Sequence, residues 1–466
     1  MYDSKLKLTF CGGVQGVTGA NFLFEEYPSS LAEGNGKKIL IDCGMFQGGD
    51  ISDDKNIEKF SYDPKSIDIL FVTHAHLDHI GRIPKLVKDG FKGIIYSTPA
   101  TKEISEISLI DSMGVLSKEA KKKDIKPLYN KEDVEKSISL WKTVKYGESN
   151  EINTSLKAKF KDAGHILGSA MIEFEHIQSE NKKRKIVFTG DLGNSAPLLK
   201  DTEALEGVDY LIVESVYGDR NHESVEERTN ILENIIENTI TNGGALLIPA
   251  FSIERTQVLL YEINNLVEEG KIPKVPVFLD SPLAIKVTGV YQDRIQNFNN
   301  EVQKEIAGGD DIFNFPLLRF TEHHQDSIKI ADTPNPKIII AGSGMSNGGR
   351  ILHHEKRHLS DPNSTLLIVG YQAAGSLGRQ ILDGAKEVEI MGKMVKVNAK
   401  VVNLTGYSAH KDSDDLLEFI DDTSDTLIKV FVVMGEKKSS LFLTQRIRDY
   451  LDVNAVAPKF GESFEL

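Results

Sequence analysis

The sequence is poor in cysteine, in long apolar runs and in positive charge. Its 466 residues include two cysteines, Cys11 and Cys43, too few for a disulfide framework, so a reducing compartment such as the cytoplasm is expected. No apolar run approaches the roughly 20 residues that cross a bilayer. The first ten residues, MYDSKLKLTF, lack the pattern of a secretory signal. These absences predict a cytoplasmic protein without membrane attachment.

The formal net charge is −14, which disfavours loose attachment of the whole surface to nucleic acid or anionic membrane. A locally basic cleft stays compatible with this charge, because a bound metal can supply a positive field of its own. Hydrophobic residues make up 40% and charged residues 27% of the chain, as in globular proteins. The length predicts two domains, or one domain with a large insertion.

Two rhythms of secondary structure follow one another along the chain. The first two hundred residues read as short strands between turns, such as KKILIDCG and KIVFTGD, with a helical stretch expected over roughly 100–145. From about residue 210, apolar strands alternate with helices, as where GALLIPAF precedes SIERTQVLLYEINNLVEEG. This alternation predicts a parallel sheet covered on both faces. The last strand, LIKVFVVMGE, returns to the first rhythm, so the second is an insertion.

Metal-ligating side chains gather in FVTHAHLDHIGRIP, residues 71–84. His74, His76, Asp78 and His79 stand within six positions at the carboxyl end of an apolar strand. In an extended chain, His74, His76 and Asp78 would share one side, with His79 beside them after a turn. Imidazole and carboxylate groups at a strand end form a ligand set that suits zinc.

Further candidates follow other predicted strands. His165 stands in DAGHILGSA, Asp191 in KIVFTGDLG and Asp42 in KKILIDCG. An aspartate beside glycine is usually a turn residue. Open α/β sheets, however, collect their sites at the carboxyl ends of strands, so we expect these side chains to meet the histidine cluster.

The stretches THAHLDHIG, GHILGSA and FTGDLG resemble the successive metal motifs of the metallo-β-lactamase superfamily. Later stretches resemble its β-CASP branch, which includes ribonuclease J and the nuclease of the cleavage and polyadenylation complex: LIVESVYGDR, IPAFSIERTQ, FLDSPLA, GSGMSNGGR, VGYQAAGSLGR and GYSAH. The resemblance implies an α/β protein, a four-layer αββα sandwich with an inserted parallel-sheet β-CASP domain. The sandwich would span residues 1–217 and 405–466, and the insertion 218–404.

The resemblance also implies a ligand set for two zinc ions. His74, His76 and His165 would hold one zinc, Asp78 and His79 the second, and Asp191 would bridge them. Asp42 would orient a histidine ligand. In the family, the second metal takes a further histidine from an HGE motif, but the strand here reads VFVVMGE, with Met434 in that place. Because a thioether is a poor zinc ligand, we expect the second site to be weakened.

Catalytic and substrate roles follow from the same resemblance. Asp78 would orient the attacking water, and His410, held by Glu214, would protonate the leaving oxygen. From the residues alone, Glu214 and His410 could equally be a strand-end carboxylate and a loop histidine. The inserted domain is expected to cover the metal face and leave a channel for a single strand. Its predicted phosphate contacts are Ser343, Gly344, Arg255, Arg350 and Arg379.

The sequence therefore predicts a zinc-dependent ribonuclease for single-stranded RNA, cutting internally or also trimming from the 5′ end, with a homodimer as one expected form. Two alternatives stay open. The chain could be an RNA-binding paralogue impaired in catalysis by Met434, or a small-molecule thioesterase or lactonase.

Overall fold

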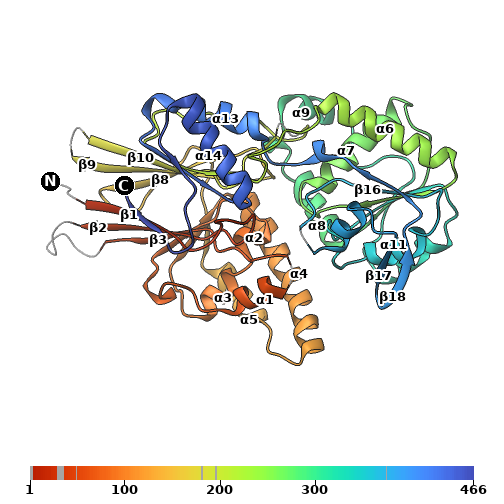
Figure 1. Cartoon of the computed structure of the whole chain (residues 1–466), viewed down its shortest axis with the longest axis horizontal. Helices are drawn as coiled ribbons and strands as arrows, with labels where there is room; N and C mark the ends of the chain where they lie inside the picture. Colours follow the sequence, from red (N-terminus) through yellow and green to blue (C-terminus); the bar gives the residue numbers. More distant parts are fainter. Residues whose placement is uncertain (1–3, 29–35, 49, 180–181, 195–196, 374) are drawn as a thin grey trace. The chain divides into compact units, whose positions relative to one another are not determined.

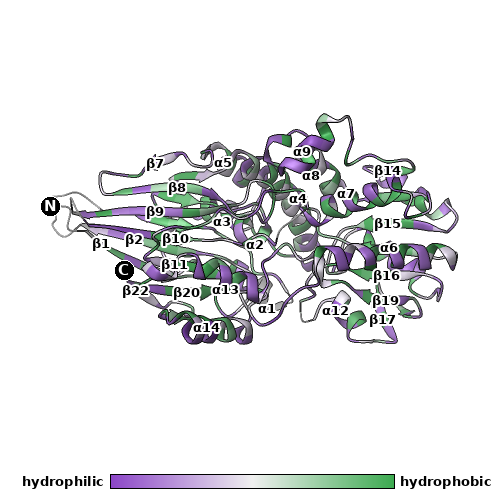
Figure 2. Ribbon diagram, turned by 90° about the horizontal axis from the view of Figure 1, so that it is seen from above, coloured by the Kyte–Doolittle hydropathy of each residue, from purple (hydrophilic) through white to green (hydrophobic). Residues whose placement is uncertain are grey.

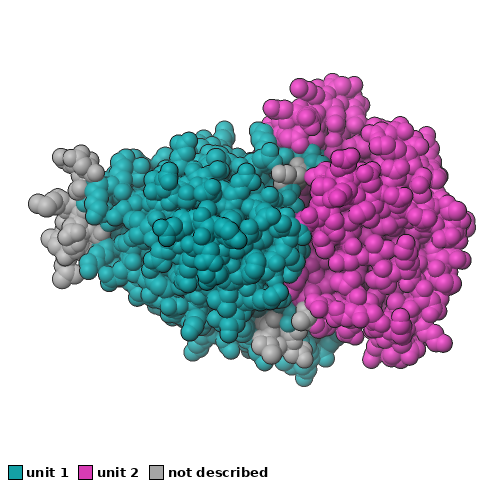
Figure 3. All heavy atoms as spheres, turned by 45° about the horizontal axis from the view of Figure 1, so that its top comes forward, with its two compact units in different colours: residues 1–221, 410–466 teal, residues 222–409 magenta. Residues whose placement is uncertain are grey.

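The computed structural model describes residues 4–28, 36–48, 50–179, 182–194, 197–373 and 375–466. The chain forms two compact units, coloured separately in Figure 3. Unit 1 comprises residues 1–221 and 410–466, and unit 2 comprises residues 222–409. No helix within the described ranges is long and apolar enough to cross a membrane.

Unit 1 is built on two seven-stranded sheets. The first has the order β22-β1-β2-β3-β4-β5-β6, with β1 Ser4–Phe10, β2 Phe22–Pro28, β3 Lys38–Ile41, β4 Ile69–Phe71, β5 Ile94–Ser97, β6 Trp141–Thr143 and β22 Ser463–Glu465. The second has the order β21-β20-β11-β10-β9-β8-β7, with β7 Ser149–Glu151, β8 Leu156–Asp162, β9 Ala170–Ser179, β10 Lys182–Phe188, β11 Tyr210–Glu214, β20 Lys429–Val433 and β21 Ala455–Val456. β3, β4, β5 and β6 pair in parallel, as do β10, β11 and β20.

Helices cover the outer face of each sheet in unit 1, so that four layers follow one another in Figure 1. The helices over the first sheet are α1 Asp50–Ile57, α2 Leu77–Ile80, α3 Ile83–Lys88, α4 Pro99–Lys123 and α5 Lys131–Ser139. The helices over the second sheet are α13 Ser413–Asp421 and α14 Lys437–Leu451.

The alternation of side chains along the strands explains these layers. In β20, Phe431 and Val433 join the core between the two sheets, whereas Val430 and Val432 pack with Leu443 of α14. Both faces of such a strand are buried, and each must be covered by another layer. The predicted four-layer αββα sandwich is therefore confirmed.

The helical stretch expected over roughly 100–145 is divided in the structure. Helix α4 ends at Lys123 because Asp124 has a left-handed backbone with φ 51°. A new helix, α5, begins after the capping residue Asn130. Trp141 then starts β6 instead of continuing the helix, and its indole N–H donates to Ser97 Oγ at 2.8 Å. This tertiary contact at the sheet edge overrides the local helical pattern.

Unit 2 contains a six-stranded sheet in the order β14-β13-β15-β12-β16-β19, with every neighbouring pair parallel. Its strands are β12 Ala245–Pro249, β13 Val277–Asp280, β14 Leu318–Phe320, β15 Lys337–Ala341, β16 Thr365–Ile368 and β19 Lys400–Asn403. A separate hairpin consists of β17 Glu387–Ile390 and β18 Lys393–Lys396. The central strands β12, β15 and β16 are buried along their whole length, and β15 and β16 are largely hydrophobic in Figure 2.

Helices connect the strands of unit 2, as the βα rhythm of the sequence predicted. They are α6 Val225–Thr241, α7 Arg255–Glu268, α8 Pro282–Gln292, α9 Asn300–Ala307, α10 His324–Lys329, α11 Ile351–His358 and α12 Leu377–Leu382. Alternate residues of β12 again face opposite sides, and Leu247 joins a core cluster with Ile351 and Leu359 from α11 and its end. Helix α6 also packs against β12. The inserted parallel-sheet domain is confirmed.

Candidate metal centre

The histidine cluster lies where β4 of unit 1 passes into a short helix. The chain stays extended through His76, which precedes α2 with φ −71° and ψ 145°. Asp78 and His79 lie within α2 itself. The strand alternation expected from the sequence therefore covers His74 and His76 only, and a helical turn positions Asp78 and His79.

Three imidazole nitrogens meet in what we call the first donor set: His74, His76, His165 and Asp191. His76 Nδ1 lies 3.2 Å from His74 Nε2 and 3.2 Å from His165 Nε2. Asp191 Oδ2 lies 3.4 Å from His74 Nε2 and 3.5 Å from His165 Nε2. His165 comes from the turn between β8 and β9, and Asp191 from the turn after β10. Donor atoms this close suit a cation held among them, and this set matches the ligand chemistry of zinc.

The buried carboxylate of Asp42 fixes the orientation of two histidines, His74 and His79. Asp42, which follows β3, accepts hydrogen bonds from Thr73 N–H, from the Thr73 hydroxyl (both 2.8 Å) and from His79 Nδ1 (2.7 Å). Because the Thr73 hydroxyl donates to Asp42, it is free to accept from His74 Nδ1, 3.0 Å away. In their neutral forms, both imidazoles then carry their lone pairs on Nε2, the atom that faces Asp191. Sequence reasoning missed Thr73, although it directly precedes His74.

A second donor set consists of Asp78, His79 and the other oxygen of Asp191. His79 Nε2 lies 3.3 Å from Asp191 Oδ1 and 3.9 Å from Asp78 Oδ2. Neither His79 Nε2 nor Asp191 Oδ1 has a hydrogen-bond partner within the described residues, although both are buried. They face each other as a buried pair of opposite charge. Both atoms are therefore available as ligands for a cation placed between them.

Met434, the residue expected to weaken the second site, packs in the core of unit 1. It follows β20, is 2% exposed and belongs to the hydrophobic core between the sheets. A Cβ added to Gly13 would lie 2.6 Å from Met434 Sδ, so the thioether packs against that glycine. Met434 N–H donates to Gly13 O at 2.7 Å. The side chain acts as core packing where the resembling family supplies a ligand.

The predicted pair Glu214 and His410 lies against the first donor set. Both carboxylate oxygens of Glu214 are 3.1 Å from His410 Nδ1. Leu192 N–H donates to Glu214 Oε1 at 2.6 Å, which anchors the carboxylate at the end of β11. His410 Nδ1 also lies 3.9 Å from Asp191 Oδ2. The side chain of His410 is 21% exposed and that of Glu214 is fully buried, so the histidine is the solvent-facing member.

Two buried imidazoles of the site are neutral, and a third is protonated. Burial lowers the pKa of His76 and of His165 well below the usual histidine value, and neighbouring imidazoles add to the effect. These rings are therefore neutral, as metal ligands must be. Burial also lowers the pKa of His410, but the adjacent Glu214 carboxylate outweighs it and raises the pKa to about 9. At neutral pH, His410 carries a proton.

Asp191 is the common element of both donor sets. Burial alone would raise the pKa of its carboxyl, but His79 and His74 hold that pKa well below its usual value. Conversely, Asp191 and Asp42 raise the pKa of His79 despite its burial. The carboxylates therefore favour positive charge at His79 Nε2, which is the electrostatic condition for binding a cation there.

The predicted phosphate contacts lie in unit 2, and three of them already have partners there. The Ser343 hydroxyl accepts from Asn347 N–H at 3.1 Å, which closes the turn after β15. Gly344 packs on the Phe251 ring, where a Cβ would lie 2.9 Å from the ring edge. Arg379 forms an exposed pair with Asp383 on the same helix, at 2.9 Å.

The other two predicted contacts differ in their surroundings. Arg350 Nη1 donates to Asp280 Oδ1 at 2.7 Å and to Thr321 O at 2.6 Å, and its Nη2 donates to Glu322 O at 2.9 Å. These bonds occupy the guanidinium and give Arg350 a structural role that sequence reasoning missed. Arg255 begins α7 and is 9% exposed. Its contact with phosphate stays a prediction.

Comparison with protein families finds three matches along the chain. Residues 27–140 match the metallo-beta-lactamase superfamily, residues 256–381 the Beta-Casp domain, and residues 394–458 the Zn-dependent metallo-hydrolase RNA specificity domain. Together they cover parts of both units.

Several curated proteins resemble the chain over nearly its whole length. Ribonuclease TTHA0252 of Thermus thermophilus is 36% identical over 93% of this chain and 94% of its own. The RNase J-like protein of Methanocaldococcus jannaschii is 33% identical over 91% and 93%. Transcription termination factor FttA of Methanosarcina mazei is 32% identical over 98% of this chain and 71% of its own. A crystal structure of a protein of unknown function from Enterococcus faecalis shares the fold, with TM-score 0.55, 14% identity and coverage of 99% and 100%.

Proposed function

The chain belongs to the metallo-β-lactamase superfamily and carries its Beta-Casp domain, and on this premise we propose that it is a zinc-dependent nuclease that cuts single-stranded RNA internally. Membership makes the chain a metal-dependent hydrolase, and the RNA specificity domain together with the ribonucleases among its relatives makes RNA its substrate. The proposal adds the identity of the metal, the single strand and the internal position of the cut.

The observation that carries the proposal is the first donor set. His76 Nδ1 lies within hydrogen-bonding distance of a nitrogen of His74 and of a nitrogen of His165. The rings of His76 and His165 are neutral, and the Asp191 carboxylate lies beside all three histidines. His74, His76 and His165 would hold the zinc, with the Asp191 carboxylate beside them. When bound, zinc would supply a Lewis acid and bring the pKa of a coordinated water down to about 7.

The remaining groups of the chain have roles that need no change of geometry. Asp78 is 20% exposed at its side chain, within reach of solvent, and would orient the attacking water. His410, which carries a proton at neutral pH, would donate that proton to the leaving oxygen. Glu214 would hold His410 through Nδ1 and stabilise its positive charge. Asp42 would keep the Nε2 atoms of His74 and His79 directed at the metal.

Three further parts of the proposal concern the cellular compartment, the contacts with RNA and the oligomeric state. Cys11 and Cys43 are buried free thiols, which supports a reducing compartment such as the cytoplasm. We also infer that Arg255 reaches the RNA backbone, whereas Arg379 must leave Asp383 to do so. The homodimer expected from the resemblance stays a prediction.

A circular single-stranded RNA tests the function and the position of the cut together. A circle has no ends, so only an internal cut makes it linear. Zinc-loaded protein should linearise the circle, a chelator should stop the reaction, and added zinc should restore it. A double-stranded RNA of the same sequence serves as the control and should survive. Degradation of a linear 5′-labelled strand with an intact circle would instead indicate trimming from the 5′ end.

Met434 favours a second candidate function, an RNA-binding protein with impaired catalysis. The second donor set lacks the histidine that the resembling family supplies, and its replacement is packed in the core. On this reading, zinc-loaded protein binds the labelled RNA but leaves both the circle and the linear strand intact. The small-molecule hydrolase of the sequence analysis is less well supported, because the Beta-Casp and RNA specificity domains point to RNA.

A further inference from the structure

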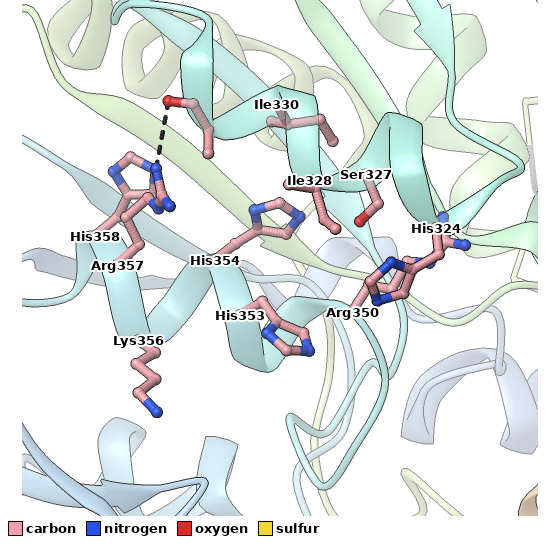
Figure 4. A pocket seen from close by; sticks show the side chains of 11 residues that line it. His324, Ser327, Ile328, Ile330, Arg350, His353, His354, Lys356, Arg357 and His358 are labelled. Carbon is pink, nitrogen blue, oxygen red and sulfur yellow. Dashed lines mark hydrogen bonds between the residues drawn. The ribbon is translucent and has the colours of Figure 1, made fainter.

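A cavity of about 470 Å³ lies in unit 2 between α10 and α11, apart from the residues of the metal centre. Seven of its lining side chains are arginine, lysine or histidine, and none of the lining residues that the structure describes is acidic. Figure 4 shows His353 and His354 in the middle of this wall, between Arg357 on one side and Arg350 on the other. In a chain with net charge −14, such a concentration of basic groups requires an explanation.

One buried carboxylate, Asp280, organises the side of the cavity beside α10. Its two oxygens accept hydrogen bonds from Arg350, His354, the Thr321 hydroxyl and the Ser327 hydroxyl, each at 2.7 Å. Burial alone would raise the pKa of Asp280, but these donors lower it to about 2. The carboxylate is therefore charged and fully used in positioning Arg350 and His354 at the cavity. It leaves the other basic groups of the wall uncompensated.

The opposite side of the cavity carries those uncompensated groups on α11. Lys356 and Arg357 form no ion pair with an acidic side chain of the described part of the chain, and Arg357 Nη1 donates only weakly, to Ala331 O at 3.3 Å (Figure 4). Burial and then the positive charges of Lys337, His354 and Arg357 lower the pKa of His358 to about 4. His358 is therefore neutral at pH 7, and the same positive field that keeps it neutral would favour a bound anion.

A metal ion does not suit this cavity, although four histidines line it. The groups of side chains that could hold a metal among the described residues all lie at the metal centre. The positive charges of Arg350, Lys356 and Arg357 would also repel a cation. The chemistry of the wall selects for an anion.

Part of the cavity wall is apolar. Ile328 of α10 is 59% exposed, and Ile330 and Ala331 continue the apolar surface beside it. The volume lies in the range of ligand sites for small organic molecules. Positive groups next to apolar side chains and imidazole rings match a ligand with both a phosphate and a flat ring, because the ring can stack on such side chains.

We propose that the cavity between α10 and α11 binds one phosphate-bearing nucleotide unit, with its phosphate at Lys356 and Arg357 and its base against Ile328 and His353. The unit belongs either to an RNA strand held outside the cleavage site or to a free nucleotide. Only the first of these sources rests on the proposed function. Neither source requires the metal centre to be active.

The test compares two double variants of the zinc-loaded, full-length protein. K356Q/R357Q removes the half-buried Lys356 and the exposed Arg357 from the cavity wall, and K271Q/K274Q removes two exposed cations that do not line it. Binding of a fluorescent, hydrolysis-resistant single strand (phosphorothioate-linked and 2′-O-methylated) is measured by anisotropy at several salt concentrations. Each phosphate neutralised on a single strand contributes about 0.7 to the slope of log K against log salt, so K356Q/R357Q, which releases one phosphate, should lower the slope by about 0.7.

A calorimetric titration with AMP distinguishes the two sources. AMP binding that is lost in K356Q/R357Q and kept in K271Q/K274Q assigns the cavity to a free nucleotide. A lowered salt slope without AMP binding assigns it to the RNA strand. Equal slopes in both variants together with no AMP binding to the unaltered protein would overturn the proposal. I328E, which adds a carboxylate at an exposed position, should weaken the same binding and provides a second variant.

These readouts are independent of cleavage. If the circular RNA stays intact in the function test, the binding measurements above still decide the proposal. If the circle is linearised but K356Q/R357Q behaves like its control, the nuclease proposal survives and the cavity proposal fails.

Discussion

The two donor sets of the metal centre share Asp191 but differ in their completeness. The first has three imidazoles whose ligand nitrogens lie 3.2 Å apart in successive pairs. The second has one imidazole and one further carboxylate, with His79 Nε2 and Asp78 Oδ2 3.9 Å apart. Met434, where the resembling family has its last ligand, lies in the core. Zinc in proteins is usually held by three or four protein groups, so the first site should bind zinc far more tightly than the second.

Because of this difference, single substitutions should change zinc binding at one donor set more than at the other. Asp42 positions a ligand of each donor set by hydrogen bonds. It bonds to His79 directly and to the Thr73 hydroxyl, which in turn accepts from His74. The ligands themselves belong to one set each, except for Asp191. Substitutions at a ligand, at the support and at Met434 should therefore affect the two sites to different degrees.

The largest effect is expected from H76A, which removes the central nitrogen of the first donor set. Zinc should be lost from that site, and cleavage should fall by about 10³-fold or more, because a catalytic metal contributes several kcal/mol to transition-state stabilisation. Zinc content by mass spectrometry and the rate of RNA cleavage provide the measurements. H323A, at an exposed histidine of unit 2, is the control. Full zinc content in H76A would show that His76 is not a ligand.

The next effect concerns chemistry without a change in metal content. H410A should slow cleavage by about 10²–10⁴-fold, the usual contribution of a general acid, while zinc content stays as in the unaltered protein. A single-turnover rate with zinc analysis on the same sample provides the measurement. E214Q should give a smaller loss, because it keeps the histidine but removes the charge that holds it. Zinc loss in H410A would instead identify His410 as a ligand.

A smaller effect is expected from D42N, which acts through the ligands it orients. Loss of such a supporting carboxylate typically lowers metal affinity about 10–100-fold, and both donor sets should be affected. T73V should weaken the first set more than the second, because the Thr73 hydroxyl lies 3.0 Å from His74 Nδ1 and 3.4 Å from His79 Nδ1. Competition with a chelator of known affinity measures both variants, and D63N, at an exposed aspartate, is the control. Equal zinc affinity in D42N and D63N would contradict this role.

M434H is expected to have the smallest effect on the cleavage rate. It should change the number of zinc ions per chain most clearly. An added imidazole would complete the second donor set, so zinc content should rise from about one to about two ions per chain. M391H provides a matched control, because Met391 also has a left-handed backbone, with φ 52° against 47° for Met434, and lies in unit 2. An unchanged zinc content in M434H would mean that this position does not face the second site.

Units 1 and 2 also differ in how far local patterns predicted them. The short β-rich runs of the first two hundred residues predicted strands of unit 1, and the βα rhythm predicted the parallel sheet of unit 2. The limits of α4 and the strand β6 were not predicted, since the bond from Trp141 to Ser97 depends on a contact across 44 positions.

The candidate site shows the same division. His74, His76, Asp78 and His79 could be named from one short motif, because their spacing is unusual in itself. Thr73 and Leu192, which fix His74 and Glu214, are ordinary residues whose role depends on their neighbours. Arg350 was predicted to contact phosphate, and the structure shows it bonded to Asp280, a residue 70 positions earlier.

By itself, the order of residues determined which chemical groups this protein can bring to a metal and which faces of its strands must be buried. The tertiary structure alone decided that Thr73 connects Asp42 to His74, that Met434 packs in the core, and that basic side chains of α11 line a cavity with α10. The physical reason is that hydrophobic periodicity acts over a few neighbouring residues, whereas the approach of distant side chains depends on how the layers pack.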